Sequence, residues 1–196
     1  FFHPEIKLPH NERLEFLGDS ILQFITSWYL YFRFPHLSEG ELSLIRSSLV
    51  NRDKLGNIAE KLKIKSFLLI GKNFDEKGLK TVLADSLEAI IGAIFLDLGI
   101  DKTKEFIEKN ILVEAEEIVR LKKYKDPKTL LQEIFQKESG SLPEYRVLEI
   151  SGPPHKRYFR IGLYLNDRKM AEGQGSSKKE AEIDAALKVL EKFYFT

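Results

Sequence analysis

Two apolar helical segments of this chain carry carboxylates on one face, and this feature constrains the fold more than any other. The acids are Glu12, Glu15 and Asp19 in the first segment, and Asp85 and Glu88 in the second. At about 100° per residue, spacings of three and seven residues keep each group on one side of its helix. No Lys or Arg occurs within 14–31 or 81–98, so neither segment supplies its own counter-charge. Because an unpaired buried carboxylate is strongly destabilising, the two faces require a cation between them.

A hard divalent cation bound by oxygen suits these acidic faces best, and Mg²⁺ is the first candidate. Gly18 and Gly92 lie beside the acidic positions inside the same segments. Glycine within a helix costs about 1 kcal/mol relative to alanine, so both glycines favour a close approach of two helices. The alternative is that the acids are ordinary exposed carboxylates on amphipathic helices, with glycines that serve packing alone. Two acidic groups in two apolar segments favour metal binding.

The first part of the chain has the apolar periodicity of helices and little of the alternation that is typical of strands. Asn11 is the expected N-cap of the first helix, and Pro35 ends that helix. A break near Asn51 divides the second segment, and Gly99 ends the third. The expected helical segments are 14–34, 40–62, 80–98 and 102–124. We therefore expect an all-α domain over residues 1–124.

The composition changes at 122–127, where the run KKYKDP indicates a linker. Beyond it, the apolar pattern predicts a small α+β domain over residues 126–196, with the element order α-β-β-β-α. The expected elements are a helix at 128–138, strands at 144–150, 158–165 and 168–174, and a final helix that begins after Ser177.

The start of the final helix carries a signal for an anion. Ser177 and Glu180 form the S-x-x-E pattern of a capping box, which places Lys178 and Lys179 in the first helical turn. Two cations at the positive end of a helix dipole are unfavourable unless a phosphate binds there. The glycines at 173 and 175 are expected to let the backbone approach such a ligand. The alternative is a pair of solvated lysines.

The overall composition excludes several classes of protein. Lys plus Arg is 31 and Asp plus Glu is 30, which gives a net charge of +1. The chain is therefore not one that binds nucleic acid through a strongly basic overall composition, although basic residues can still be gathered in one region. The absence of cysteine excludes disulfides, thiolate metal sites and cysteine nucleophiles. There is no signal peptide and no run of about 20 apolar residues, so we expect a soluble cytoplasmic protein without membrane contact. Because the chain does not begin with Met, we also expect an incomplete N-terminus.

Three motifs resemble those of bacterial ribonuclease III: NERLEFLGDS at 11–20, SEGELSLIRSSLVN at 38–51 and LADSLEAIIGAIFLDLG at 83–99. The resemblance implies that the all-α domain is a nuclease domain. It implies a homodimeric, Mg²⁺-dependent endoribonuclease, with Mn²⁺ as a substitute metal, that cleaves double-stranded RNA in rRNA and mRNA precursor processing. The implied products carry 5′-phosphate and 3′-hydroxyl ends. By the same resemblance, the metal ligands are Glu15, Asp19, Asp85 and Glu88, of which Asp19 and Glu88 are catalytic. The resemblance also implies that Glu12 and Glu39 are auxiliary acids and that Phe16 lies at the dimer interface.

The second domain resembles the double-stranded-RNA-binding domain in its element order and its basic helix start. The resemblance implies that the first helix and the loop at 152–156 face successive minor grooves, while the final helix holds phosphates between them, as A-form RNA requires. The implied RNA-binding residues are Thr129, Gln132, Glu133, Gln136, His155, Ser177, Lys178 and Lys179. Glu182 stands where the wider family often has a further lysine. Two other functions remain open: a non-catalytic double-stranded-RNA scaffold with a nuclease-like fold, and a metal-dependent hydrolase of a smaller phosphoester.

Overall fold

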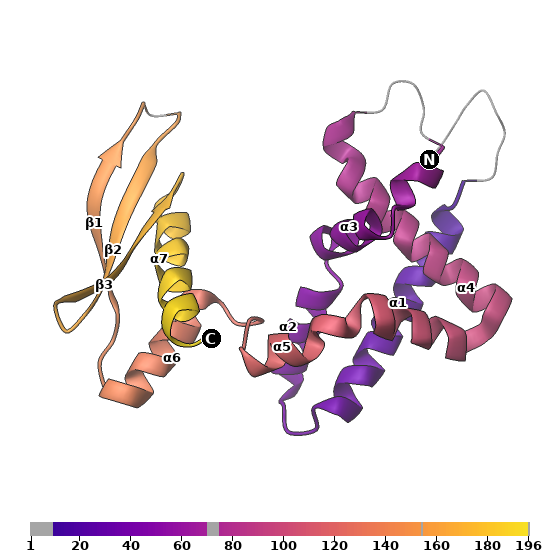
Figure 1. Ribbon diagram of the computed structural model, residues 1–196, viewed down its shortest axis with the longest axis horizontal. Coiled ribbons are helices and arrows are strands. Elements are labelled where there is room, and N and C mark those ends of the chain that lie inside the picture. The colour runs from indigo at the N-terminus through magenta and orange to yellow at the C-terminus, as the bar shows by residue number, and fades with distance from the viewer. Residues whose placement is uncertain (1–9, 70–74, 154, 196) are drawn as a thin grey trace. The chain divides into compact units, whose positions relative to one another are not determined.

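The structure is a computed structural model, and it describes residues 10–69, 75–153 and 155–195. The chain divides into two compact units, Phe1–Ile118 and Val119–Thr196. The first unit is helical, and the second combines a three-stranded sheet with two helices (Figure 1). The predicted fold class, an all-α domain followed by a small α+β domain, is confirmed.

The helices of the first part of the chain follow the predicted segments with shifted ends. They are α1 (Glu12–Arg33), α2 (Glu39–Leu49), α3 (Arg52–Lys61), α4 (Leu79–Asn110) and α5 (Ala115–Arg120), with 3₁₀ turns at Ile64–Phe67, Glu76–Gly78 and Leu112–Glu114. Gly99, at φ 78° and ψ −176°, has a non-helical backbone, and two helical segments of α4 meet at this kink, so the predicted helix end at Gly99 is confirmed. The helix predicted at 102–124 does start as a separate segment after this kink, but it is not continuous: a 3₁₀ turn at Leu112–Glu114 separates the last part of α4 from α5, which ends at Arg120.

Side-chain caps explain where two of these helices begin. Asn51 accepts a hydrogen bond of 2.9 Å from the backbone N–H of Lys54, so the predicted break between α2 and α3 is confirmed. Ser38 and Glu41 form a complete capping box at the start of α2. Asn11 precedes α1 but makes no side-chain capping bond, since its φ of −91° and ψ of 8° differ from the extended conformation of a capping residue. Asn11 therefore occupies the predicted N-cap position, but its side chain does not cap the helix.

The packing of α1 against α4 forms most of the core of the first unit. Leu22 and Ile25 of α1 are buried, as are Leu83, Leu87 and Ile91 of α4. Burying each such side chain contributes roughly 1.5–3 kcal/mol to folding. The same packing turns the acidic stretches of the two helices toward each other.

The second unit packs two helices on an antiparallel sheet with the strand order β1-β2-β3. Its elements are α6 (Pro127–Ser139), β1 (Glu144–Ser151), β2 (Tyr158–Leu165), β3 (Arg168–Gly175) and α7 (Lys178–Phe193). Leu163 lies opposite Tyr145 and Ala171 in the register of the sheet and is fully buried in the core with Leu131 and Val189. The predicted helix and strands of this unit are confirmed to within one residue at each end.

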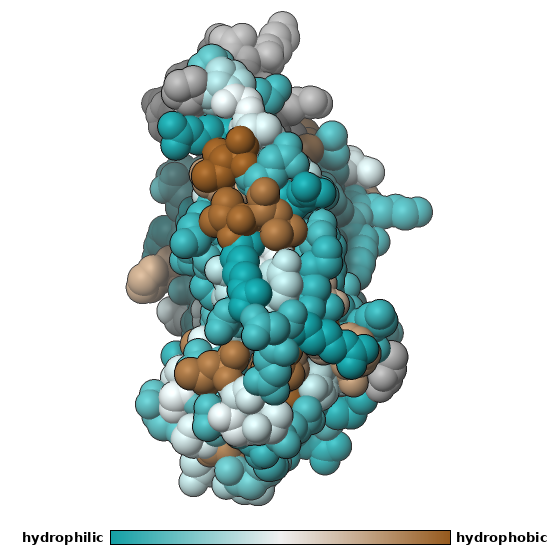
Figure 2. Space-filling view, turned by 90° about the vertical axis from the view of Figure 1, so that its left-hand side faces the viewer, coloured by the Kyte–Doolittle hydropathy of each residue, from teal (hydrophilic) through white to brown (hydrophobic). Residues whose placement is uncertain are grey.

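The face seen in Figure 2 is largely hydrophilic, with a small group of apolar side chains in its upper half and further apolar side chains lower down. On the second unit, Val147, Leu148 and Ile150 of β1 are exposed. Small apolar groups within a polar surface are normal for a folded domain. In the described ranges, no helix is both long and apolar enough to cross a membrane.

Candidate functional site

Helices α1 and α4 touch backbone to backbone at two glycines. A Cβ atom added to Gly18 would lie 1.8 Å from the carbonyl oxygen of Glu88, and one added to Gly92 would lie 2.3 Å from the carbonyl oxygen of Leu14. Both distances are far below van der Waals contact, so only glycine fits at either position. The close helix approach predicted from these two glycines is confirmed.

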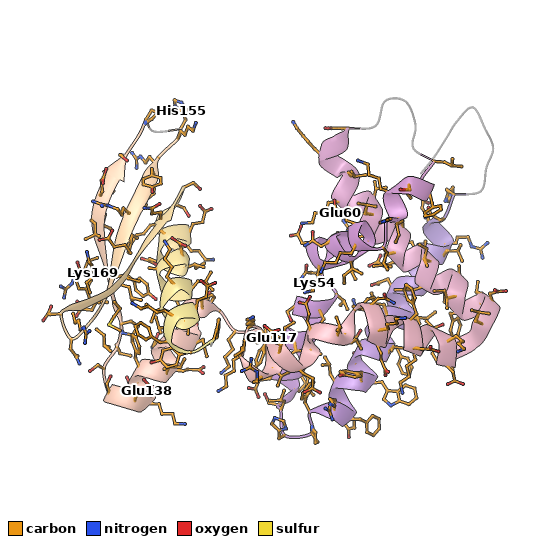
Figure 3. All side chains as sticks on the ribbon, in the orientation of Figure 1. Lys54, Glu60, Glu117, Glu138, His155 and Lys169 are labelled. Carbon is orange, nitrogen blue, oxygen red and sulfur yellow. The ribbon has the colours of Figure 1, made fainter. Side chains whose placement is uncertain are left out.

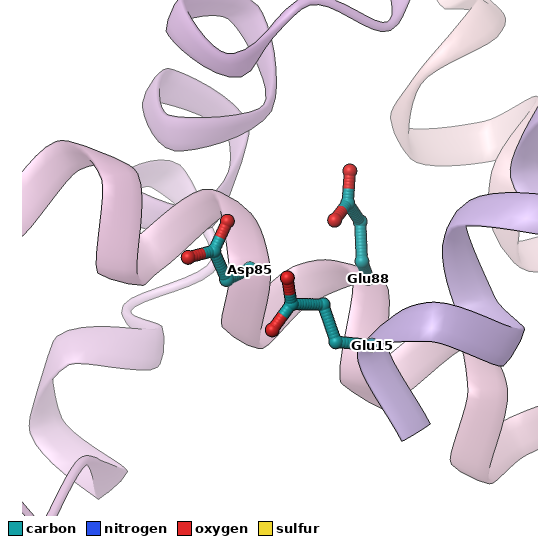
Figure 4. A group of neighbouring side chains, drawn as sticks. All are labelled: Glu15, Asp85 and Glu88. Carbon is teal, nitrogen blue, oxygen red and sulfur yellow. The ribbon is translucent and has the colours of Figure 1, made fainter. Parts of the chain in front are cut away.

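This crossing brings together carboxylates from both helices. Glu15, Asp85 and Glu88 each offer one oxygen, and these oxygens lie within 4.8 Å of one another. Figure 4 shows Glu15 reaching from α1 toward the side chains of Asp85 and Glu88 on α4. All three side chains are half-buried. We refer to these three residues as the acidic cluster.

Burial and mutual repulsion disfavour the ionised form of the acidic cluster. Burial, followed by the charges of Asp19 and Asp85, raises the pKa of Glu88 to about 7. Burial and the charge of Asp85 also raise the pKa of Glu15 above its ordinary value. A raised pKa means that the surroundings do not compensate the charged carboxylate for its lost hydration and for the repulsion of its neighbours. The cluster is therefore an electrostatically incomplete site that a cation would complete.

Arg52, the first residue of α3, brings a positive charge to the acidic cluster. Its Nη2 atom lies 3.8 Å from Oδ1 of Asp85, and its charge lowers the pKa of both Glu15 and Glu88. The same oxygen of Asp85 is buried and accepts no hydrogen bond from the described residues. A buried carboxylate oxygen without a partner, beside two further carboxylates, fits the all-oxygen ligand set of a hard divalent cation. Sequence reasoning missed Arg52, because no spacing rule connects its helix to Asp85.

Asp19 lies beside the acidic cluster without joining it. Its carboxylate accepts a hydrogen bond of 3.4 Å from Nε2 of Gln23, one turn further along α1. Its charge nevertheless raises the pKa of Glu88, so the two carboxylates act on each other. Asp19 is therefore not among the residues whose carboxylate oxygens lie within 4.8 Å of one another.

The remaining predicted residues of the first unit lie outside the acidic cluster. Glu12 is exposed, with a carboxylate oxygen 3.3 Å from Nδ1 of His10. Glu39, the first residue of α2, is exposed and accepts a hydrogen bond of 3.0 Å from the hydroxyl of Ser43. Phe16 follows the cluster residue Glu15 near the start of α1 and is 77% exposed, which is unusual for a large apolar side chain.

The predicted RNA-contacting residues of α6 share an exposed face. These residues are Thr129, Gln132, Glu133 and Gln136. Glu133 is paired with Lys125, whose Nζ lies 2.7 Å from its carboxylate. His155 is exposed in the loop between β1 and β2, at the end of the hairpin (Figure 3). The structure thus leaves both predicted contact regions open to solvent.

The start of α7 has the Ser177 half of the predicted capping box, whereas the Glu180 carboxylate bonds to Ser176. The hydroxyl of Ser177 accepts a hydrogen bond of 3.1 Å from the backbone N–H of Glu180, so capping by Ser177 is confirmed. The carboxylate of Glu180 accepts a bond of 2.9 Å from the backbone N–H of Ser176. Lys178 and Lys179 are exposed in the first turn of the helix. A phosphate has open access to both ammonium groups.

Glu182 lies between two lysines from different helices. Its carboxylate forms an ion pair with Lys128 of α6 and lies 3.9 Å from Nζ of Lys178. The Glu182 side chain is only 12% exposed, whereas that of Lys178 is 61% exposed. Lys128 also lies over the ring of Tyr145, with its Nζ 4.8 Å from the ring centroid. Sequence reasoning missed Lys128, since its approach to Glu182 depends on the packing of α6 against α7.

The expectation that Gly173 and Gly175 admit a ligand is wrong. A Cβ atom at Gly173 would lie 2.0 Å from the carbonyl oxygen of Ala181, and one at Gly175 would lie 2.7 Å from the nitrogen of the same residue. Helix α7 occupies the space beside both glycines. Their missing side chains allow α7 to pack closely on β3.

Comparison with known proteins gives the same division of the chain. The Ribonuclease-III-like family matches residues 2–115, and the double-stranded RNA binding motif matches residues 127–193. Ribonuclease 3 of Carboxydothermus hydrogenoformans is 43% identical over 97% of this chain and 83% of its own length. Ribonuclease 3 of Borreliella burgdorferi is 41% identical over 94% of this chain and 78% of its own length. A crystallised nuclease domain of ribonuclease III from Campylobacter jejuni is 40% identical over 55% of this chain and 79% of that chain, with a TM-score of 0.48. The chain therefore belongs to the ribonuclease III family of double-stranded-RNA-specific endoribonucleases.

Proposed function

We propose that this protein is a Mg²⁺-dependent endoribonuclease that cuts both strands of double-stranded RNA and leaves 5′-phosphate and 3′-hydroxyl ends. One observation carries the metal part of the proposal: Glu15, Asp85 and Glu88 converge from two helices with oxygens within 4.8 Å of one another. An all-oxygen ligand set of this kind suits Mg²⁺, and Mn²⁺ as a substitute. Membership of the ribonuclease III family supports the activity and the substrate class.

In the proposed mechanism, Glu15, Asp19, Asp85 and Glu88 hold the metal. When bound there, Mg²⁺ lowers the pKa of a coordinated water and stabilises the negative charge on the departing 3′ oxygen. Glu88 must lose its proton before it can bind a cation, and its raised pKa makes this step sensitive to pH near neutrality. Asp19, whose charge acts on Glu88, would supply a further carboxylate for the metal. Glu12 and Glu39 act as auxiliary acids at the edge of the site.

We propose that the second unit grips the RNA by its shape. The exposed face of α6 and the His155 loop would contact two minor grooves, and the start of α7 would hold phosphates between them. Ser177 fixes the helix start, while Lys178 and Lys179 supply the positive charge. This assignment treats residues 1–124 as the catalytic domain and 126–196 as the RNA-binding domain.

We propose a homodimer, because two antiparallel strands require two active sites related by a two-fold axis. Phe16 supports this proposal, since a phenylalanine that is 77% exposed beside the acidic cluster offers an apolar contact to a second subunit. The proposed substrates are rRNA and mRNA precursors in the cytoplasm, by relation to the bacterial enzymes of the family.

A long RNA duplex incubated with and without Mg²⁺, and analysed on a denaturing gel, tests the proposal. Glu88→Gln keeps the side-chain shape but removes one ligand charge, so we expect cleavage to fall on the order of 100-fold or more. Duplex binding in a gel-shift assay should remain at the wild-type level. Glu105→Gln is the matched control, because Glu105 is an exposed acid of α4 that pairs with Lys102, away from the cluster. Cleavage by Glu88→Gln at the wild-type rate would refute the assignment of Glu88. If the wild type binds the RNA duplex but does not cleave it, a non-catalytic scaffold would be favoured.

A further inference from the structure

The contact between Arg52 and the acidic cluster is electrostatic and loosely held. Its Nη2 atom lies 3.8 Å from Oδ1 of Asp85, which is beyond hydrogen-bond length. That oxygen is buried and has no hydrogen-bond partner in the parts of the chain that the structure describes. The Arg52 side chain is 71% exposed, whereas that of Asp85 is only 21% exposed. The guanidinium therefore reaches the cluster from solvent and can leave without any change in the core.

The position of Arg52 in α3 also indicates that its charge serves the acidic cluster more than its own helix. It is the first residue of the helix, where a positive charge is unfavourable because the helix dipole is positive at that end. The start of α3 is fixed without it, since Asn51 caps the backbone N–H of Lys54. Arg52 thus contributes little to its own helix. Its charge serves the carboxylates of α1 and α4, which have no Lys or Arg within 14–31 or 81–98.

We propose that Arg52 is a displaceable counter-ion: its guanidinium partly neutralises the acidic cluster when no metal is bound, and a divalent cation must displace it from Asp85. This inference rests on the proposed metal-dependent function. Arg52 and the cation compete for one carboxylate, so the arginine lowers the affinity for the metal while it stabilises the metal-free fold. Arg52 is a positioning residue in this scheme and touches no reacting atom.

The proposal predicts two changes of opposite sign when the charge of Arg52 is removed. Metal-free protein should become less stable, because the acidic cluster loses the positive charge of Arg52. Metal binding should become tighter, because the competitor is gone. A purely structural ion pair would lower stability with and without metal, and a residue that helps to hold the metal would weaken its binding. The opposite signs separate a counter-ion from both of these roles.

The experiment is a thermal melt of the full chain without RNA, repeated across a series of Mg²⁺ concentrations. Ligand binding to the folded state raises the melting temperature in proportion to the logarithm of its concentration over Kd, so one series yields both readouts. For Arg52→Gln we expect a lower midpoint without metal and roughly three- to tenfold tighter Mg²⁺ binding, as suits one solvent-exposed charge. Arg52→Lys, which keeps the charge, should stay near the wild type.

Lys80→Gln is the matched control. It removes the same charge from a neighbouring ion pair, in which Nζ of Lys80 lies 3.0 Å from Oδ1 of Asp53, and should leave Mg²⁺ affinity unchanged. Equal or weaker Mg²⁺ binding by Arg52→Gln would overturn the counter-ion role. If the wild type cleaves duplex RNA in Mg²⁺ while Arg52→Gln binds the metal no more tightly, this inference alone fails. If the wild type neither binds Mg²⁺ nor cleaves, the proposed function fails with it.

Discussion

Replacing Gly18 by alanine tests whether the contact between α1 and α4 holds the acidic cluster in place. The added Cβ would lie 1.8 Å from the carbonyl oxygen of Glu88 and 2.9 Å from the nitrogen of Gly92. Carbon and oxygen atoms pack without repulsion at about 3.5 Å, so the two helices must separate by roughly 1.5 Å. The obstacle is backbone in the core of a long helix, which cannot rotate away as a side chain can.

The expected loss of stability follows from two opposing contributions. Overpacking costs about 1–3 kcal/mol, and a clash between backbones belongs at the upper end of that range. Alanine restores about 1 kcal/mol through its higher helix propensity. The net loss of about 2 kcal/mol should lower the melting temperature of the first unit by roughly 5–10 °C. Glu15 would also move away from Asp85 and Glu88, so Mg²⁺ affinity should fall roughly tenfold or more.

Gly40→Ala is the control for this experiment, because a Cβ atom at Gly40, in α2, meets no atom within 4 Å. That variant should be as stable as the wild type or slightly more stable, with unchanged Mg²⁺ affinity. Calorimetric melts and Mg²⁺ titrations of both variants give the comparison. If Gly18→Ala matches Gly40→Ala in both measurements, the helix contact does not position the cluster and the reasoning fails.

Three further predictions concern charge. The pKa of Glu88 is about 7 in the folded chain and lower in the unfolded chain, so the folded state binds the proton more tightly. The stability that this proton contributes is full below pH 4.5 and is lost as the pH rises through 7. The melting temperature of the metal-free protein should therefore fall from pH 5 to pH 8, and that of Glu88→Gln should fall by less. The double variant Lys178→Ala, Lys179→Ala should weaken binding to every duplex sequence alike. It should also reduce the slope of log affinity against log salt concentration by roughly 1–2 units. An unchanged slope would mean that these lysines are merely solvated. Glu182→Gln removes a carboxylate 3.9 Å from Nζ of Lys178, so duplex binding should become roughly three- to tenfold tighter in gel shifts. Glu191→Gln, near the other end of α7, should bind as the wild type does, and equal affinity for both variants would count against a role for Glu182.

The sequence predicted that acids of two helices converge, because each contributing pattern is local, but it also grouped Glu12 and Asp19 with them, and these two lie outside the acidic cluster. Asp85 and Glu88 share a face by helical spacing, and the lack of Lys or Arg in both apolar segments required a cation from elsewhere. The identity of that side chain, Arg52, was not predictable, since it belongs to a third helix whose packing on α4 is set by long-range contacts. The hydrogen bond from Gln23 to Asp19 was also beyond reach, because it depends on a side-chain rotamer.

The role of a glycine could not always be predicted from the sequence either. Gly18 and Gly92 were correctly interpreted as a close helix approach, whereas Gly173 and Gly175 were assigned to a ligand that α7 in fact excludes. A missing side chain is equally useful beside a ligand and beside a helix, so residue type alone does not distinguish these environments. For the second unit, local alternation predicted the strands to within one residue, but the pairing of Lys128 with Glu182 required the packed structure.

The crossing of α1 and α4 also has a consequence for the order of events in folding. Gly18 contacts Glu88 and Gly92, which follow it by 70 or more residues, so this contact closes a long stretch of chain. The carboxylates approach one another in the same step as the glycines, and their repulsion opposes it. Mg²⁺ that binds only after this step would slow unfolding and leave the refolding rate unchanged, whereas Mg²⁺ bound in the transition state would speed refolding. Refolding kinetics with and without Mg²⁺ would therefore reveal when the helix pair assembles.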